Sequence, residues 1–343
     1  MKKVVIIGGG FTGAYCAKRL QEKFEVTLID KTEYFEFTPS VLKAIVNPKF
    51  SKNIQIRHRE YLKKGKFICG EVSEVTEKFV LVNDKKIKFD YLIIASGSRY
   101  NSPIKDPLIL IPERGSEIRE YHDKLEKAKN VAVVGGGLVG VELCAEIINK
   151  YPNKIITLVH SHKCLIERNC KRSQNYVEKY IREKGVEIIF GEHASQKTQD
   201  TLITDKGNKI KADLVFMCIG IRSNSELMTK NFKDKLDEHG QVKVNEFLQM
   251  NEEKKIFVGG DVANIKEEKT AQSAEDHAKI IVRNITRLEY GGKLKKYKAE
   301  KKAFVISLGR WNGIFEYRDF ILTGIVAAFM KKFIEWKTMR RYR

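Results

Sequence analysis

Little in this 343-residue sequence suggests disulfides, metal ligands or membrane spans. The six cysteines form no C-x-x-C pair and no spacing typical of metal ligands, so we expect no metal site and a reducing compartment. No apolar run reaches the roughly 18 residues that a spanning helix needs. The chain enters an apolar strand pattern at once and has Lys2 as its second residue. We therefore expect neither a signal peptide nor N-myristoylation, and a cytoplasmic location.

Acidic residues are too few to balance the basic ones. The chain has 64 Lys and Arg against 44 Asp and Glu, which gives a formal net charge of +20. Such a surplus favours an anionic partner, which could be a membrane surface, an acidic protein or a nucleic acid. No nucleic-acid-binding motif accompanies the charge, so we expect no nucleic acid. A lysine-rich solvated surface is the simpler alternative.

What the sequence does have is a glycine motif near its start. Residues 3–13 read KVVIIGGGFTG, an apolar run typical of a buried parallel strand followed by G-x-G-x-x-G and a helical pattern. The glycines permit a tight turn and close approach of a pyrophosphate, which the helix N-terminus attracts. Asp30 ends the next apolar strand, where a ribose-binding acid is expected, although a turn aspartate is the alternative. The candidate binding residues of the loop are Gly8, Gly10, Phe11, Thr12 and Gly13.

The same arrangement occurs a second time. Residues 131–140 read VAVVGGGLVG, again an apolar strand that leads into G-x-G-x-x-G. The following strand ends at residues 160–163, HSHK, with no carboxylate to hold a ribose 2′-hydroxyl or repel a 2′-phosphate. Two dinucleotide sites on one chain are most simply explained by electrons that pass between them. The candidate binding residues of this loop are Gly135, Gly137, Leu138, Val139 and Gly140.

Shorter stretches carry a family resemblance. ASGS at residues 95–98 and KIFVGGD at residues 255–261 resemble the interdomain turn and the flavin motif of flavoproteins with two dinucleotide-binding domains. Other stretches resemble the ferroptosis-suppressor, or AIF-like mitochondrion-associated, type of that family, which is related to type II NADH dehydrogenases. These stretches are IITLVHS (155–161), GIRSNS (220–225), VNEFLQM (244–250), ISLGRWNG (306–313) and WKTMR (336–340).

The resemblance implies a fold and an activity. The α/β fold would have two Rossmann-like domains in a glutathione-reductase-like arrangement, with a small C-terminal α+β segment. FAD would bind residues 1–112 and 246–300, NADH or NADPH would bind residues 113–245 with weak discrimination, and residues 301–343 would form a membrane- and quinone-associated segment. The enzyme would reduce a membrane quinone and be peripherally membrane-associated. The alternatives are a reductase of a small acidic iron–sulfur protein and a signalling or nucleic-acid-binding flavoprotein.

The resemblance also implies cofactor contacts outside the glycine loops. Some of these residues have simpler explanations, because Lys31 could be plain surface, Thr38-Pro39 a simple turn and Val72 part of the core. For FAD the expected residues are Asp30, Lys31, Thr38, Pro39, Val72, Ala95, Ser96, Gly97, Gly260, Asp261 and Val262, and for NAD(P)H they are His160 and Gly220.

Four residues are candidates for the chemistry. Glu142 would orient the nicotinamide or relay a proton to quinone, and a helix-start glutamate favoured by the dipole is the alternative. Gln272 would lie near the flavin ring, and Lys331 or Lys332 near the quinone. His277 matches the pattern of the ferroptosis-suppressor type but is expected to serve in the core or at the surface.

The positions of the cysteines narrow the choice of electron acceptor. Residues 34–46, where disulfide reductases of this family place reactive cysteines, contain none. Sulfide:quinone reductases need a redox cysteine late in the chain, and the last one here is Cys218. We therefore expect hydride transfer to flavin and onward transfer to an external acceptor.

The C-terminal tail carries an apolar stripe of helical period. Residues 331–343 add six Lys or Arg and one Glu. We expect the tail from about Phe315 to dock on an anionic membrane, where apolar burial and charge act together. A helix packed on the protein's own core, or on a second subunit in a homodimer, is the alternative. The stripe comprises Leu322, Ile325, Val326, Phe329, Phe333 and Trp336.

Overall fold

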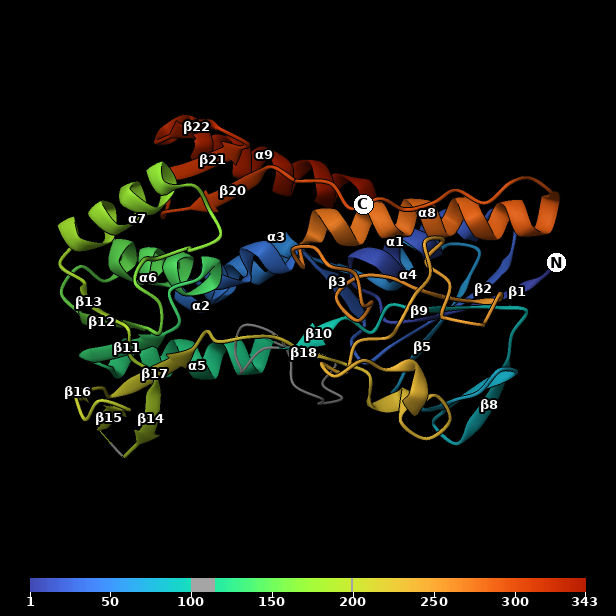
Figure 1. Cartoon of the computed structure of the whole chain (residues 1–343), viewed down its shortest axis with the longest axis horizontal. Coiled ribbons are helices and arrows are strands. Elements are labelled where there is room, and N and C mark those ends of the chain that lie inside the picture. Colours follow the sequence, from blue (N-terminus) through green and yellow to red (C-terminus); the bar gives the residue numbers. More distant parts are fainter. Residues whose placement is uncertain (100–114, 199) are drawn as a thin grey trace.

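The computed structural model describes residues 1–99, 115–198 and 200–343. Two α/β lobes lie side by side along its long axis (Figure 1). The first lobe holds the start of the chain and also the long helix α8, Ala271–Tyr290, which comes after the second lobe in sequence.

The first lobe is built on a five-stranded parallel sheet in the order β19-β9-β1-β2-β5. Helices α1 and α8 pack against each other over one face, and the antiparallel β6-β7-β8 sheet packs on the other, so the strands alternate between two apolar cores. This explains why β1 reads as a continuous apolar run. The elements are β1 Lys3–Ile7, α1 Phe11–Leu20, β2 Glu25–Asp30, β5 Lys66–Cys69, β6 Val72–Val75, β7 Phe79–Val82, β8 Lys85–Lys88, β9 Tyr91–Ile94 and β19 Ile256–Val258.

Short elements between β2 and β5 form a bridge toward the second lobe. The segment α2 contacts both α5 and α6 of that lobe. These elements are β3 Tyr34–Glu36, the 3₁₀ turn η1 Thr38–Ser40, α2 Val41–Val46, η2 Pro48–Phe50, α3 Ser51–Ile54, β4 Gln55–Arg57 and α4 His58–Tyr61.

The second lobe repeats the plan of the first. A four-stranded parallel sheet, β13-β12-β11-β17, carries the antiparallel β14-β15-β16 sheet on one face, where Leu202 and Ile210 pack on Ala132 and Val159. The elements are α5 Gly115–Lys127, β11 Asn130–Val134, α6 Leu138–Lys150, β12 Ile155–His160, α7 Lys171–Glu183, β13 Glu187–Phe190, β14 Ala194–Lys197, β15 Thr201–Thr204, β16 Lys209–Lys211 and β17 Leu214–Met217.

The chain crosses between the lobes on two short antiparallel strands, β10 Ser98–Arg99 and β18 Arg222–Ser223. We expected the second domain to run to residue 245. In the structure Met228, Phe232 and Val242 pack in the core of the first lobe, so the return begins near residue 224 because these apolar side chains are buried there. The 3₁₀ turns η3 Glu226–Met228 and η4 Lys233–Lys235 lie in this return. The expected boundary at residue 112 lies outside the described residues.

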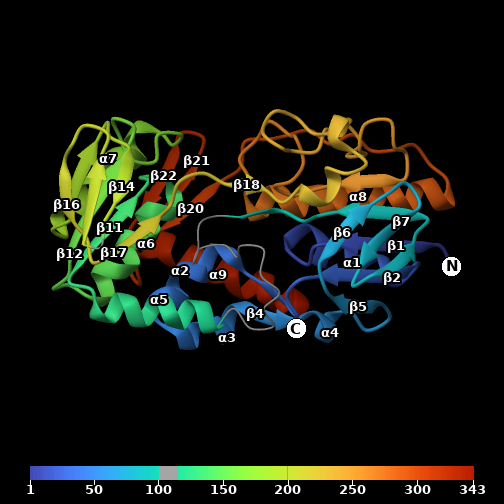
Figure 2. The ribbon, with the colours of Figure 1, turned by 90° about the horizontal axis from the view of Figure 1, so that it is seen from below.

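The C-terminal segment is a three-stranded antiparallel sheet followed by a helix: β20 Phe304–Ser307, β21 Gly313–Tyr317, β22 Phe320–Thr323 and α9 Ile325–Tyr342. The helix runs from the second lobe toward the first (Figures 1 and 2). Our expectation that Leu322 belongs to a helical stripe is wrong, because Leu322 pairs with Phe315 in the β21–β22 hairpin and Gly324, at φ +85°, separates it from α9. Among the described residues, no helix has the length and apolarity to cross a bilayer.

Candidate active site

The first glycine loop has no room for a side chain at Gly8 or Gly13, whereas Gly10 faces open space. A Cβ on Gly8, whose φ is +96°, would lie 2.2 Å from the carbonyl oxygen of Ala95, and one on Gly13 would lie 1.7 Å from that of Gly8. Gly10 precedes α1, caps it with no side chain, and a Cβ there would meet nothing within 4 Å. The N-terminus of α1, at Phe11 and Thr12, is therefore open to an anion, as a dinucleotide pyrophosphate requires.

Asp30 lies at the end of β2 and is tied to this loop. Its carboxylate accepts hydrogen bonds from the backbone N–H of Gly9, from the backbone N–H of Thr32 at 2.7 Å and from the Thr32 hydroxyl at 2.8 Å. A carboxylate has about four acceptor positions, so Asp30 can hold the loop and still accept from a ribose hydroxyl.

His58 is a residue of this site that the sequence did not indicate. It is fully buried, and a Cβ on Gly9 would lie 2.3 Å from its ring. Its Nδ1 lies 2.5 Å from the Tyr61 hydroxyl, and its Nε2 has no hydrogen-bond partner. Burial lowers the pKa of His58, partly offset by Asp30. Nothing in the local sequence links His58, 28 positions after Asp30, to the glycine loop.

The second glycine loop is constructed like the first. Gly135 has φ +110°, and a Cβ on Gly140 would lie 1.8 Å from the carbonyl oxygen of Gly135. Gly137 precedes α6, whose first turn holds Leu138 and Val139, and it too faces open space and provides no capping side chain. The chain thus has two uncapped helix starts of the same geometry, one in each lobe.

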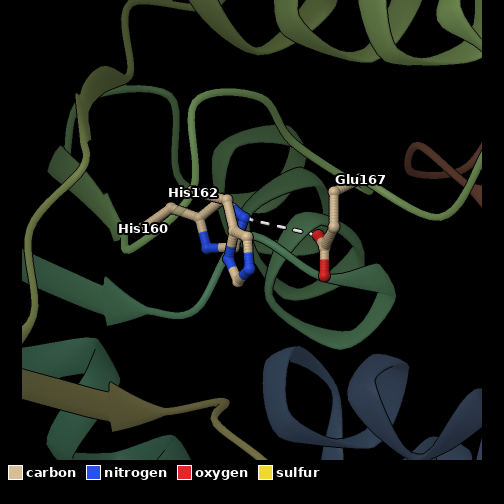
Figure 3. Close-up of side chains that lie close together, drawn as sticks. All are labelled: His160, His162 and Glu167. Atoms are coloured by element: carbon tan, nitrogen blue, oxygen red, sulfur yellow. Dashed lines mark ion pairs between the residues drawn. The ribbon is translucent and has the colours of Figure 1, made fainter.

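A carboxylate does reach the end of β12, contrary to our expectation. Glu167, in the loop after that strand, brings Oε2 to 3.5 Å from Nε2 of His160 (Figure 3). The His160 ring packs beneath the glycine loop, at 2.8 Å from a Cβ built on Gly136, and burial lowers its pKa. Gly220, at φ +58°, follows β17 in the same lobe. No local sequence pattern indicates Glu167, because it lies in an irregular loop.

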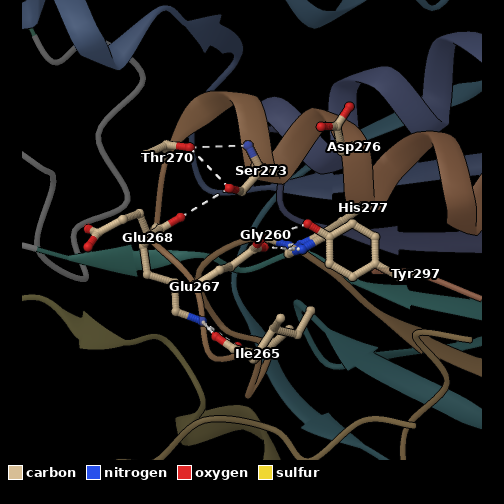
Figure 4. A network of polar contacts seen from close by, with 12 residues as sticks. Gly260, Ile265, Glu267, Glu268, Thr270, Ser273, Asp276, His277 and Tyr297 are labelled. Carbon is tan, nitrogen blue, oxygen red and sulfur yellow. Dashed lines mark hydrogen bonds and ion pairs between the residues drawn. The ribbon is translucent and has the colours of Figure 1, made fainter. Parts of the chain in front are cut away.

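The predicted flavin motif is connected to a buried polar network (Figure 4). The backbone N–H of Gly260 donates to Nδ1 of His277 at 3.0 Å, His277 Nε2 lies 2.7 Å from Glu267, and the Tyr297 hydroxyl donates to Glu267 at 2.7 Å. Since Nδ1 accepts, the proton of His277 is on Nε2. His277 is thus a core residue, as expected, and it also holds the backbone of the flavin motif.

Asp261 and the turn at residues 95–98 meet where the lobes join. The Ser98 hydroxyl donates to Asp261 at 2.5 Å, and Ser96 donates to the backbone carbonyl of Asn224 at 2.6 Å. Gly97, at φ +69°, accepts from the backbone N–H of Asn224 at 3.0 Å. The structure therefore brings the two flavin-related stretches of the sequence, residues 95–98 and 255–261, together.

Two of the four residues predicted to take part in the chemistry contact each other. Glu142, in the first turns of α6, forms an ion pair with Lys331 of α9 at 2.5 Å and accepts from the backbone N–H of Ser307 at 2.7 Å. Their side chains are only 12% and 10% exposed. Glu146 lies one turn further along α6, near Ser307, and burial raises its pKa. The sequence analysis missed Glu146, although i, i+4 spacing from Glu142 was a usable signal.

Lys332 points elsewhere than Lys331. Its ammonium group lies 4.5 Å from the ring centre of Trp311 and 5.1 Å from that of Phe329. Of the two lysines that the sequence could not separate, only Lys331 contacts Glu142.

The remaining predicted residues are dispersed around the first lobe. Lys31 forms an ion pair with Glu71 at 2.6 Å, and Val72 is buried in the core, as its alternative interpretation held. Thr38 and Pro39 form the turn η1, directly before α2. Gln272 is exposed on the first turn of α8, and Val262 is fully buried beside Asp261.

Comparison with known proteins identifies relatives along the whole chain. A family model described as pyridine nucleotide-disulphide oxidoreductase matches residues 2–278. Apoptosis-inducing factor homolog A of Dictyostelium discoideum is 35% identical over 345 residues, covering 91% of this chain and 84% of that protein. Human ferroptosis suppressor protein 1 is 31% identical over 360 residues, covering 98% and 96%.

Solved structures match the fold. NDH2 from Plasmodium falciparum in complex with NADH superimposes with a TM-score of 0.84 at 16% identity, covering 99% of this chain and 96% of that one. The sulfide:quinone oxidoreductase of Aquifex aeolicus gives a TM-score of 0.81 at 20% identity, covering 100% and 92%. These matches confirm the predicted α/β fold and the predicted resemblance.

Proposed function

Because this chain belongs to the pyridine nucleotide-disulphide oxidoreductase family, we propose that it is an FAD-dependent NAD(P)H:quinone oxidoreductase. FAD fits the first lobe and NADH or NADPH the second, since each lobe offers an uncapped helix start beside a glycine loop whose central glycine, Gly10 or Gly137, faces open space where a pyrophosphate can approach the backbone. Bound FAD would accept a hydride from the nicotinamide and pass two electrons to the quinone.

The observation that carries this proposal is the pair of open helix starts, one in each lobe. All six cysteines are free. Cys16, Cys144 and Cys218 are buried, and burial raises the pKa of each, so they are poor thiolates. The partly exposed Cys69, Cys164 and Cys170 form no disulfide, and residues 34–46 contain no cysteine, so an external acceptor is favoured. A quinone is favoured because a structural relative is a sulfide:quinone oxidoreductase.

Glu142 and Lys331 support a role at the quinone. Reduction of a quinone to hydroquinone by a hydride equivalent needs one further proton, and a buried carboxylate–ammonium pair can supply or stabilise it. The pair joins α6, which begins at the proposed NAD(P)H loop, to α9. Glu146 lies beside it, and burial raises its pKa, so it holds a proton more readily than an exposed glutamate does.

The exposed face of α9 supports a peripheral position on an anionic membrane. Large apolar side chains on this helix are 42–59% exposed, which is unusual for a face with no partner. Basic residues follow on the same helix, where they would approach lipid headgroups. The exposed apolar residues of α9 are Ile325, Val326, Phe329, Phe333, Ile334 and Trp336.

An anaerobic stopped-flow titration tests the proposed reaction. The purified protein should be yellow, and NADH or NADPH should bleach it. A short-chain quinone should then restore the oxidised flavin spectrum in repeated turnovers. Loss of FAD on purification, or reduced flavin that quinone does not reoxidise, would contradict the proposal. Reoxidation only by an acidic iron–sulfur protein, with strong salt dependence, would support the alternative acceptor.

Sedimentation with anionic liposomes tests the membrane position. Deletion from Gly313 would remove β21 and the buried Tyr342, so point substitutions are the better perturbation. The variant Phe329→Ser/Phe333→Ser should lose liposome binding and reduction of long-chain quinone while NADH still bleaches the flavin. Leu288→Ser, at an exposed apolar position on α8, is the matched control. Full liposome binding by the double variant would contradict the membrane position. Conversion of a dimer to a monomer by the double variant in sedimentation velocity would show that the exposed face of α9 is instead a subunit interface.

A further inference from the structure

Three potential metal ligands gather at the end of β12. The ring nitrogens of His160 and His162 and a carboxylate oxygen of Glu167 all lie within 4.8 Å of one another. Figure 3 shows the two imidazole rings next to each other on the same side of Glu167; their centres are 5.1 Å apart and their planes are tilted by 38°. Within residues 1–99, 115–198 and 200–343, this is the only group of His, Cys, Asp and Glu side chains with such spacing.

His160 makes a long ion-pair contact with Glu167 through its Nε2 atom. Its side chain is 6% exposed, and its Nε2 has no hydrogen-bond partner, nor does Oε2 of Glu167 at 3.5 Å. These two atoms face each other at 3.5 Å without a hydrogen bond between them, so a metal ion that binds both would satisfy two buried polar atoms at once.

We propose that His160, His162 and Glu167 bind one divalent transition-metal ion of the zinc class. Two imidazole nitrogens and one carboxylate oxygen form a ligand set that zinc accepts, with water in the fourth position. Ligand atoms around a tetrahedral zinc ion lie about 3.4 Å apart. The His160–Glu167 distance already meets this value, and the His162 side chain is exposed and contacts the hydroxyl of its neighbour Ser161 at 3.1 Å. A small rotation of His162 therefore completes the site.

An ion at this position would inhibit the binding of NAD(P)H. The ligands lie beneath and beside the loop at Gly136, at the end of β12, where the adenosine ribose of a dinucleotide lies in this type of fold. A metal ion there and NAD(P)H would compete for the same space and for the same side chains. This second part rests on the proposed function, whereas metal binding itself does not.

Titration calorimetry of the FAD-loaded protein without nucleotide tests the metal site. Zinc chloride should bind with a stoichiometry of one, and magnesium chloride should not bind, because Mg²⁺ prefers an all-oxygen site. His162→Ala and Glu167→Gln should each weaken zinc binding by about tenfold or more. His239→Ala, an exposed histidine beside Glu238, is the matched control and should bind zinc like the wild type. No zinc binding, or equal binding by wild type and His162→Ala, would overturn the assignment.

A second measurement tests the competition. In anaerobic stopped flow, zinc should raise the apparent Kd of NADH for flavin reduction without changing the limiting rate, and His162→Ala should abolish that zinc effect. A zinc-independent Kd in a protein that binds one zinc ion would refute the inhibitory role. A protein that binds zinc but is not reduced by NADH would instead contradict the proposed function and leave the metal site standing.

Discussion

Replacement of Lys331 by Met should destabilise the docking of α9 on the second lobe. It would leave the Glu142 carboxylate, 12% exposed, without its ion-pair partner. Removing one member of a buried pair costs about 3–5 kcal/mol. Glu142 keeps its hydrogen bond from the Ser307 backbone, and both side chains retain slight exposure, so we expect about 2–3 kcal/mol. This corresponds to a roughly 30- to 150-fold increase in local opening of α9.

Hydrogen exchange of the α9 amides measures this opening directly. A local measurement is preferable because a protein with two lobes need not unfold in one step. Lys331→Met should accelerate exchange of these amides by the stated factor. Lys337→Met, at an exposed position on the same helix, should have little effect.

A double-mutant cycle separates the pair from its surroundings. Glu142→Gln should cost less than Lys331→Met, since Glu146 still lies near the ammonium group and the Gln carbonyl can still accept from Ser307. The double variant should be more stable than Lys331→Met alone, because it buries no unpaired charge. Additive effects in this cycle, or exchange within a factor of about three of wild type for Lys331→Met, would refute the reasoning.

Three further predictions concern the cofactor loops and two buried ionisable side chains. Gly13→Ala should abolish FAD retention, which absorbance measures. Gly140→Ala should retain FAD and raise the Kd of NADH at least about tenfold, which stopped flow measures. In both variants the new Cβ would lie within 1.8 Å of a backbone carbonyl oxygen. Burial raises the pKa of Glu146 from 4.5, so the folded chain holds the carboxyl proton more tightly than the unfolded chain does. The contribution of this proton to the free energy of unfolding is full below pH 4.5 and is lost as the pH rises through the raised pKa. Glu146→Gln should therefore resist urea better than wild type at pH 8 but not at pH 4. His277→Ala should leave the Glu267 carboxylate and the flavin-motif N–H without their partner, and should release FAD more readily in a fluorescence assay than wild type does.

The glycine loops could be predicted because their cause is local. Gly13 must lack a side chain because its Cβ would collide with Gly8, five residues earlier. Both glycines belong to one strand–turn–helix unit, so the spacing of the motif is enough to predict this contact. The same holds for Gly140 and Gly135. The doubled motif therefore predicted both lobes.

Contacts between distant segments could not be predicted in this way. His58, on the short helix α4, packs under the first loop, and Glu167, in an irregular loop, lies beside His160; the positions of both segments depend on the whole fold. The apolar run 321–330 showed no break between strand and helix, because an apolar strand and an apolar helix face have the same composition. Gly324 was the available signal, since only its positive φ lets the chain turn from hairpin to helix there.

The position of α9 links the proposed membrane surface to the proposed chemistry. Lys331 on its inner face binds Glu142 in the second lobe. Glu335, further along, accepts from Ser40 at 2.5 Å and pairs with Lys43 at 3.2 Å in the bridge from the first lobe. At the end of the helix, Tyr342 packs on Phe35 with ring centres 4.6 Å apart. The helix therefore clamps both lobes.

This clamp has a consequence for electron transfer. A hydride moves only when donor and acceptor atoms are about 3–3.5 Å apart, and here the two dinucleotides would be held by different lobes. The opposite face of α9 is the exposed apolar one, about one helix diameter, or ~10 Å, from Lys331. The inner face of α9 would fix the relative position of the lobes, whereas a surface that binds the outer face would bring a lipid-soluble acceptor close to the Glu142–Lys331 pair. Weakening Lys331 should therefore slow flavin reduction by NADH as well as quinone reduction, whereas polar substitutions at Phe329 and Phe333 should slow only the second step.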